Sequence, residues 1–358
     1  MNPKDSKRLL LGAIIVMIIA AGGRYHVGAD FPIYKGMYEE GFPLYTTYAD
    51  VWDKATFQPN SMELEWAFVL LNKILYDLGL PFYALTFVMA TLALTILYKV
   101  LTKYSSFPGV SFIFYYLPLY FIVECGQMRQ GMGGALVLLS VPYILERKMW
   151  KFLLVMFIAL GFHKSVIVFV PAYWLVKLPF NAKTWTTLVI ISVFLAPFQV
   201  YKLFGGAFES LMPQDVSNAY TGYENDRYYG NAMETSFADV FNIFFIIILL
   251  AYDKIGTKKV YYYEYFRNLA FFGFCLFYIL RGNEIFATRL PGSYFTMAGY
   301  FMVPGIIACL EGERKYLMKY VMLGYFIMFY VLFSMGNAKR GNFTWGSYQN
   351  VIWSKTTY

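Results

Sequence analysis

Residues 83–98 read YALTFVMATLALTILY, a run without a charge in which apolar side chains predominate. A helix that crosses a bilayer needs about 20 such residues, within a range of about 17–25. Similar, nearly uncharged runs recur along the chain and predict helices at 9–23, 83–98, 109–126, 128–145, 149–163, 165–179, 184–203, 236–252, 265–281, 286–310 and 316–335. The pattern predicts an all-α, polytopic transmembrane protein with about eleven spans. We expect a single integral membrane domain over residues 1–358.

The composition of the chain agrees with this class. Of its 358 residues, 59% are apolar and 15% are charged, and the mean hydropathy is +0.48. Soluble proteins carry about 45–50% apolar and about 25% charged residues, so a soluble enzyme, a secreted disulfide scaffold and a disordered chain are excluded. Cys125, Cys275 and Cys309 lie in apolar segments without metal-ligand spacing. We therefore expect no disulfide framework, no metal site and no cofactor.

The stretch 60–80 differs from the other apolar segments because it contains Glu63, Glu65, Lys73 and Asp77. Each charge would cost about 2.5–3.5 kcal/mol near the centre of a bilayer. We expect a helix that lies on the membrane or is tucked against the protein, with Asn60 or Ser61 as its N-cap. In such a helix Glu65 shares a face with Phe68, Leu71 and Asn72, so its carboxylate is a candidate base.

The distribution of charge predicts the topology. Lys4, Lys7 and Arg8 precede the first apolar run and favour a cytoplasmic N-terminus. Alternating spans then place the connections 99–108, 146–148, 177–183, 253–264 and 311–315 inside, and the long loops 24–82 and 204–235 outside. Lys and Arg exceed Asp and Glu on the inner side, so the net charge of +8 reflects membrane orientation rather than nucleic-acid binding. Since the inner loops are short, we expect any chemistry on the outer face.

Polar residues at the outer rim of the spans are candidate functional residues. They are Arg24 and Asp30, Glu65, Arg129 and Gln130, His163, and Arg281 and Arg289. Arg129 opens a predicted helix, and its guanidinium group together with a helix N-terminus suits a phosphate. Each group also has a structural alternative: Arg129 could pair with Glu124, Arg289 with Glu284, His163 could be a hydrogen-bonded structural residue, and Arg24 could extend to the interface. The Tyr-rich segment 220–229 could contact sugars or be an ordinary exposed loop.

The common catalytic motifs are missing from the sequence. It contains no P-loop, G-x-G-x-x-G, H-E-x-x-H, G-x-S-x-G or D-x-D motif, which argues against ATP-driven transport, dinucleotide chemistry, zinc proteolysis and serine hydrolysis. Arginines at the level of the lipid headgroups would stabilise a diphosphate leaving group. A carboxylate would accept the proton of an acceptor hydroxyl. The set predicts glycosyl transfer from a lipid-linked sugar.

Five short motifs, in order and with similar spacing, resemble the EpsG family of bacterial exopolysaccharide and O-antigen polymerases, which are akin to the Wzy type. The motifs are Arg24-x-x-Val27-Gly28-x-Asp30-x-x-x-Tyr34, Glu65-x-x-Phe68-x-Leu70-Leu71-Asn72-Lys73, Arg129-Gln130-Gly131, Phe162-His163-Lys164-Ser165 and Arg289-Leu290-x-x-Tyr294-Phe295. The sequence departs from the family pattern at Trp66-Ala67, where Pro-Gly is usual, and in the loop 204–235, which has no match.

The resemblance implies a GT-C-like polymerase that transfers a glycan from one undecaprenyl-diphosphate carrier to the repeat unit on another, for O-antigen (lipopolysaccharide) or exopolysaccharide synthesis. It implies a bacterial inner-membrane protein with its active site on the periplasmic or outer face, and a chain-length regulator as a candidate partner. By motif match, the diphosphate would be bound by Arg129, Arg289 and Arg24, and further substrate contacts would come from Tyr34, Gln130 and Tyr294. The catalytic candidates are Glu65, His163 and Asp30, with Glu65 or His163 taking the acceptor proton. Arg281, which lies outside the motifs, is a further candidate for the diphosphate. The alternatives are a flippase or transporter of the same lipid-linked sugars, an O-antigen ligase, and a sugar acyltransferase.

Overall fold

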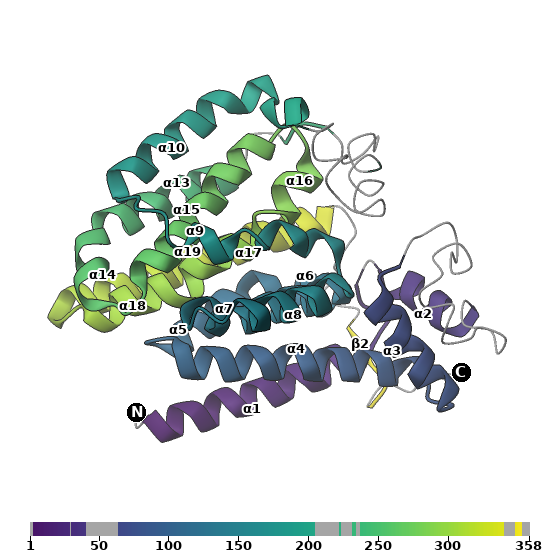
Figure 1. Cartoon of the computed structure of the whole chain (residues 1–358). Coiled ribbons are helices and arrows are strands. Elements are labelled where there is room, and N and C mark those ends of the chain that lie inside the picture. Colours follow the sequence, from purple (N-terminus) through teal and green to yellow (C-terminus); the bar gives the residue numbers. More distant parts are fainter. Residues whose placement is uncertain are drawn as a thin grey trace.

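The computed structural model describes residues 3–28, 30–40, 64–204, 222, 231–233, 237–339 and 348–352. Within these ranges the chain is mostly helical, and every run that predicts a helix contains one (Figure 1). The expected all-α class is therefore confirmed. The two strands are two residues long each, β1 (Arg24–Tyr25) and β2 (Gln349–Asn350), and they pair in an antiparallel ladder.

The first half of the chain assembles around α4 (Phe82–Tyr104). Helix α1 (Pro3–Gly22) and helix α7 (Met128–Leu145) both pack along α4, and α8 (Met149–Leu160) packs along α7 (Figure 1). Helix α4 buries Leu85, Met89, Ala93 and Leu97. Residues four apart share one helix face, so a single apolar stripe explains this packing.

The second half assembles around α15 (Tyr263–Leu280), which packs against α10 (Ala182–Leu195) and α17 (Gly292–Met297). The remaining elements of this half are η5 (Ala196–Phe198), η6 (Val200–Phe204), α13 (Phe237–Ala251), α14 (Asp253–Lys259), α16 (Glu284–Arg289), η7 (Ala298–Met302), α18 (Val303–Cys309) and α19 (Gly312–Lys339). The predicted helix 286–310 is thus a chain of short segments from α16 to α18, with a π-helix at η7.

Two other predicted helices are interrupted. The run 109–126 is divided into α5 (Pro108–Phe114), the π-helix η3 (Tyr115–Tyr120) and α6 (Phe121–Val123). Within η3, the backbone angles of Leu117 are not helical. Leu117 precedes a proline, and the residue before a proline is driven away from helical angles. The expected break at His163 is also confirmed, because His163 is extended between α8 and a 3₁₀ helix, η4 (Lys164–Phe169), which leads into α9 (Ala172–Leu175).

Within 60–80 the structure has a helix that is shorter than the sequence predicts. The helix is α3 (Trp66–Asp77), and it buries one face against the protein. Glu65 is therefore not inside the helix but at its N-cap, with extended angles, so it does not share the predicted face. The predicted caps, Asn60 and Ser61, lie outside the described residues, as does the segment 220–229 apart from Gly222. The loop 24–82 also contains α2 (Phe31–Glu40).

Three helical stretches of the described chain are long and apolar enough to cross a membrane. They are Phe82–Tyr104, Glu284–Cys309 and Gly312–Leu332, and shorter apolar helices of 10–17 residues accompany them. The chain therefore has the character of a membrane protein. The predicted number of about eleven spans is not confirmed by these lengths and stays a prediction.

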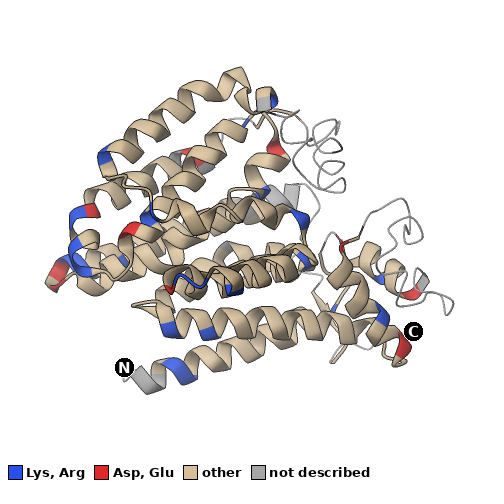
Figure 2. Ribbon diagram, in the orientation of Figure 1, with Lys and Arg blue, Asp and Glu red and all other residues tan. Residues whose placement is uncertain are grey.

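The short basic connections meet at one end of the molecule, which we call the basic end. Figure 2 shows blue residues gathered at the end where the N-terminus lies. The Tyr98 hydroxyl donates to the Lys7 carbonyl, and Lys103 and Glu146 are close enough to interact electrostatically. Since α7 runs from Met128 to the basic turn at 146–148, residue 128 lies toward the opposite end.

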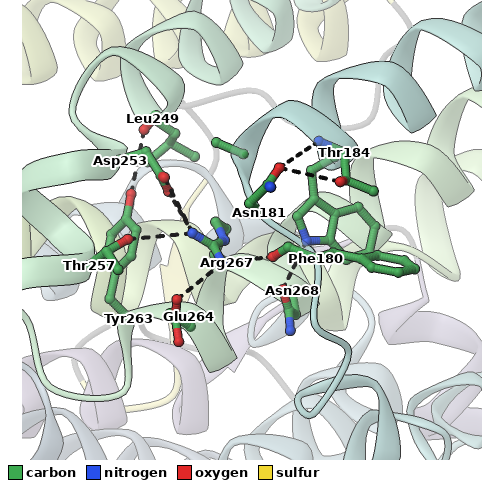
Figure 3. A network of polar contacts seen from close by, with 12 residues as sticks. Phe180, Asn181, Thr184, Leu249, Asp253, Thr257, Tyr263, Glu264, Arg267 and Asn268 are labelled. Carbon is green, nitrogen blue, oxygen red and sulfur yellow. Dashed lines mark hydrogen bonds and ion pairs between the residues drawn. The ribbon is translucent and has the colours of Figure 1, made fainter.

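A network around Arg267 holds the basic end of α15 (Figure 3). The buried guanidinium group donates to the Asp253 carboxylate at 3.2 Å and to the Phe180 carbonyl at 2.7 Å. The next residue, Asn268, accepts a hydrogen bond from the Trp185 indole at 2.8 Å. These contacts tie α15 to α14, to α10 and to the connection before α10.

Candidate functional site

The centre of the candidate site is an ion pair between two segments far apart in the sequence. Arg129 lies in the first turn of α7, and its guanidinium NH1 is 2.6 Å from Oε2 of Glu65. The Arg129 side chain is 14% exposed and that of Glu65 is 6% exposed. Arg129 therefore does not pair with Glu124, the structural alternative that the sequence suggested.

Glu65 also reaches the break between α8 and η4. Its Oε1 accepts a hydrogen bond from the backbone amide of Lys164 at 3.1 Å and lies 3.4 Å from Nδ1 of His163. Both ring nitrogens of His163 are buried, and within the part of the chain that the structure describes neither makes a hydrogen bond of the usual geometry. The carboxylate of Glu65 thus connects the start of α3 to α7 and to the break at His163.

Gly161 determines where α3 begins. Its carbonyl oxygen accepts hydrogen bonds from the backbone amides of Ala67 and Phe68 at 2.8 and 3.0 Å. These are two of the amides that a helix leaves unpaired at its N-terminus. A Cβ at Gly161 would lie 2.6 Å from the Trp66 ring and 2.7 Å from the Ala67 side chain. Glycine at this position therefore allows the close contact that places Glu65 beside Arg129.

The ionisation of Glu65 follows from its neighbours. Burial alone would raise the pKa of Glu65, but the positive charge of Arg129 and the nearby His163 imidazole outweigh it and lower the pKa to about 2. Glu65 is therefore ionised at neutral pH and is a weak proton acceptor, because a general base is most effective when its pKa lies near the working pH. Its main effect in this structure is to hold Arg129.

Tyr34 and Asp30 extend the cluster into the first loop. The Tyr34 hydroxyl accepts a hydrogen bond from Nε of Arg129 at 3.3 Å and donates one to Oδ2 of Asp30 at 3.4 Å. The guanidinium carbon of Arg129 lies 5.6 Å from the Tyr34 ring centre and 5.8 Å from that of Phe68. Five of the residues predicted for the site, Asp30, Tyr34, Glu65, Arg129 and His163, are therefore in one chain of contacts, which we call the Arg129 cluster.

A cavity of about 280 Å³ begins beside the Arg129 cluster: none of the five cluster residues lines it, but Gln130 and Ser165, close in sequence to Arg129 and His163, do. Its polar lining includes Glu124, Gln130, Ser165, Thr288, Arg289 and Thr296. Among the described residues that line it, Glu124 is the only carboxylate and Arg289 the only cation. The charge of Arg289 also acts on His163, so the cavity and the cluster share one electrostatic environment.

Arg24, which the sequence placed in an exposed loop, is 1% exposed. Its guanidinium group donates to the Ala21 carbonyl and contacts the Met128 sulfur at 3.7 Å. Its charge acts on Glu124 and on Tyr34, although Arg24 does not itself line the cavity. Arg24 is therefore placed to compensate a buried carboxylate, and no hydrogen bond or ion pair among the described residues joins it to the Arg129 cluster.

Two further predicted residues are engaged elsewhere. Arg281 forms an ion pair with Asp239, with one contact of 2.7 Å between NH2 and Oδ2, and it is not part of the cavity lining. Tyr294 is fully buried, and its hydroxyl donates to the Val168 carbonyl at 2.6 Å. The structure brings neither side chain into contact with the Arg129 cluster.

The residues that line the cavity are less conspicuous in the sequence than those of the Arg129 cluster. From the sequence, Glu124 is indicated only as an ion-pair partner for Arg129. A carboxylate between two apolar runs is nevertheless unusual in a membrane protein and could have marked it as a candidate. Within the described residues, no group of three or more His, Cys, Asp or Glu side chains is placed to hold a metal ion.

Comparison with known proteins adds a family. The sequence model of the EpsG family matches residues 7–350. The chain belongs to the EpsG family. No curated protein and no protein of solved structure matches it. Membership in the EpsG family associates this membrane protein with polysaccharide polymerases. The motifs that resembled the family in the sequence lie inside the matched range.

Proposed function

We propose that this EpsG-family chain polymerises lipid-linked oligosaccharide repeat units. It would transfer a glycan from an undecaprenyl-diphosphate carrier to the repeat unit on a second carrier. The observation that carries the proposal is the meeting of the Arg129 cluster with the Arg289 cavity at the end opposite the basic end. Two arginines at one site suit a diphosphate, the group on which negative charge develops in such a transfer.

The geometry supports a role for Arg129 in diphosphate binding. A guanidinium group has five N–H donors, and the bonds to Glu65 and Tyr34 engage two of them. Arg129 also lies in the first turn of α7, where the free backbone amides and the helix dipole favour an anion. Glu65 holds the guanidinium group in place, and Arg289 supplies a second positive charge within the cavity.

The orientation in the membrane follows from the positive-inside rule. The basic end, with the N-terminal helix α1, would face the cytoplasm of a bacterial inner membrane, and the Arg129 cluster would face the outside. The ladder between β1 and β2 lies at the far end of α1, so the C-terminal segment 348–352 would also be outside. Lipid-linked repeat units presented on that face could reach the cavity without an external energy source.

The proposal is tested with purified protein and a defined undecaprenyl-diphosphate repeat unit. We expect the wild-type protein to produce a ladder of longer lipid-linked glycans, and Arg129→Ala to abolish it while the protein still reaches the membrane. Arg314→Ala is the matched control, because Arg314 is exposed in the first turn of α19 at the basic end. An intact ladder from Arg129→Ala would contradict the proposal. Transfer only to lipid A core, and not to a second undecaprenyl-diphosphate repeat unit, would favour a ligase.

A further inference from the structure

The cavity contains a carboxylate to which the sequence motifs assign no role. Glu124 follows α6 and is 3% exposed. Its Oε1 accepts a hydrogen bond from the Tyr115 hydroxyl at 2.6 Å. The side chain forms part of the same lining as Arg289, Gln130 and Ser165.

The other acid–base candidates are less well placed for the cavity. Glu65 is held by Arg129 and by the Lys164 amide, and it is not among the lining residues. His163 likewise does not line the cavity, although Ser165 and Val166 do. A group that accepts a proton from a bound substrate must come within hydrogen-bond reach of it, and among the described lining residues only Glu124 offers a carboxylate.

Burial disfavours the charged form of Glu124, and two neighbouring groups offset part of that cost. The guanidinium group of Arg24 is close enough to compensate the negative charge, and the Tyr115 hydroxyl donates to it. A Cβ at Gly131 would lie 3.1 Å from Oε1 of Glu124, so glycine leaves room for the carboxylate. The titratable and charged groups that face Glu124 are Arg24 from β1, Tyr115 and Tyr120 from η3, the adjacent Cys125 and Tyr300 from η7, with Arg289 also in the lining.

We infer that Glu124 is the proton acceptor for the attacking sugar hydroxyl, an inference that rests on the proposed polymerase function. The oxygen of the acceptor hydroxyl forms a bond to the anomeric carbon of the donor glycan. The bond from that carbon to the diphosphate oxygen breaks, and its electron pair leaves with the diphosphate, whose charge Arg289 and Arg129 stabilise. The hydroxyl proton passes to the Glu124 carboxylate and is released to water after the product leaves.

The test compares Glu124→Gln and Glu124→Asp with wild type in the polymerisation assay. Gln keeps the size of the side chain and can still accept the hydrogen bond from Tyr115. We expect kcat to fall by about 10²–10⁴ in Glu124→Gln, the KM for the donor to change by less than about threefold, and Glu124→Asp to recover part of the rate. Glu146→Gln is the matched control, because Glu146 is exposed in the turn after α7 at the basic end.

A second variant tests the role without removing the carboxylate. Tyr115→Phe deletes the hydroxyl that stabilises the charged form of Glu124, so the acid limb of the kcat profile should move to higher pH. An unshifted limb, or a Glu124→Gln variant with wild-type kcat, would overturn the inference. A Glu124→Gln variant that raises KM and leaves kcat intact would also overturn it, because the carboxylate would then serve only binding. If wild type makes no polymer, the proposed function itself fails, and the two failures are thus distinguishable.

Discussion

The ion pair between Glu65 and Arg129 should be a major stabilising contact as well as a part of the site. Both side chains are almost fully buried, and the paired atoms are 2.6 Å apart. Opposite charges with centres about 4 Å apart attract by about 4 kcal/mol at an effective dielectric constant of about 20. Removing one partner of a buried pair leaves the other charge uncompensated and typically costs about 3–5 kcal/mol. We expect a loss in this range for Glu65→Gln.

The free thiols provide the assay. Cys125 and Cys275 are buried, so a thiol-reactive fluorescent dye reports their exposure when purified protein unfolds on heating. Cys309 is only partly buried and would react early, so Cys309→Ser is introduced into every variant. A loss of 3–5 kcal/mol should lower the midpoint of unfolding on the order of 5–10 °C.

An exposed ion pair provides the control for this prediction. Lys35 and Glu39 are 3.7 Å apart, one helical turn from each other in α2, and their side chains are 28% and 52% exposed. Such pairs contribute about 0.3–0.5 kcal/mol, so Glu39→Gln should barely move the midpoint. The double variant Glu65→Gln/Arg129→Gln should lose about 2–3 kcal/mol less than the sum of the single variants. Equal effects of Glu65→Gln and Glu39→Gln, or strict additivity of the pair, would refute the reasoning.

Three further predictions concern Glu65, Gly161 and Arg267. The pKa of Glu65 is lowered from its ordinary value of 4.5 to about 2. The free energy of unfolding of wild type should therefore fall by about 3 kcal/mol relative to that of Glu65→Gln as the pH drops from about 4.5 to about 2; parallel acid-unfolding curves would contradict this. Gly161→Ala should weaken the docking of α3 and lower polymer yield. Gly324→Ala in α19, where a Cβ meets nothing within 4 Å, should leave the yield unchanged; equal yields would show that the contact at Gly161 is unimportant. Arg267→Gln removes the bonds to the Asp253 carboxylate and the Phe180 carbonyl, so it should lower the midpoint of thermal unfolding. The KM for the donor, measured on the protein that remains folded, should stay within about twofold of wild type. A large change in KM would place the Arg267 network in the site.

The helices could be predicted from the sequence because a long apolar run without charges indicates a helix shielded from water and gives its approximate length. Helix α7 occupies 128–145, the predicted range. The start of α3 could not be predicted in the same way. Asn60 and Ser61 are good capping residues, but the first amides of α3 are satisfied by the Gly161 carbonyl, a tertiary partner that no local pattern reveals.

The sequence predicts five residues that the structure brings together in the Arg129 cluster, but it does not predict how they pair. A cation at the rim of an apolar run is costly, so Arg129 is conspicuous in the sequence. Nearness in the chain favoured Glu124 as its partner, yet the carboxylate that meets it is Glu65, which comes 64 positions earlier. The neutral lining of the cavity was less conspicuous still, because Thr288 and Thr296 bond to carbonyls of their own helical turns, as hydroxyls in apolar helices commonly do.

The different surroundings of Glu65 and Glu124 explain how one site can bind an anion and also accept a proton. A carboxylate bound tightly to an arginine is held ionised far below neutral pH, so Glu65 can position Arg129 but is a poor base. Glu124 is compensated by Arg24 at a longer range and is hydrogen-bonded by the neutral Tyr115 hydroxyl, so its proton affinity is free to respond to the substrate. Since environments that differ in this way separate the pKa values of two acids, the structure assigns positioning to the carboxylate outside the cavity and proton transfer to the one inside it.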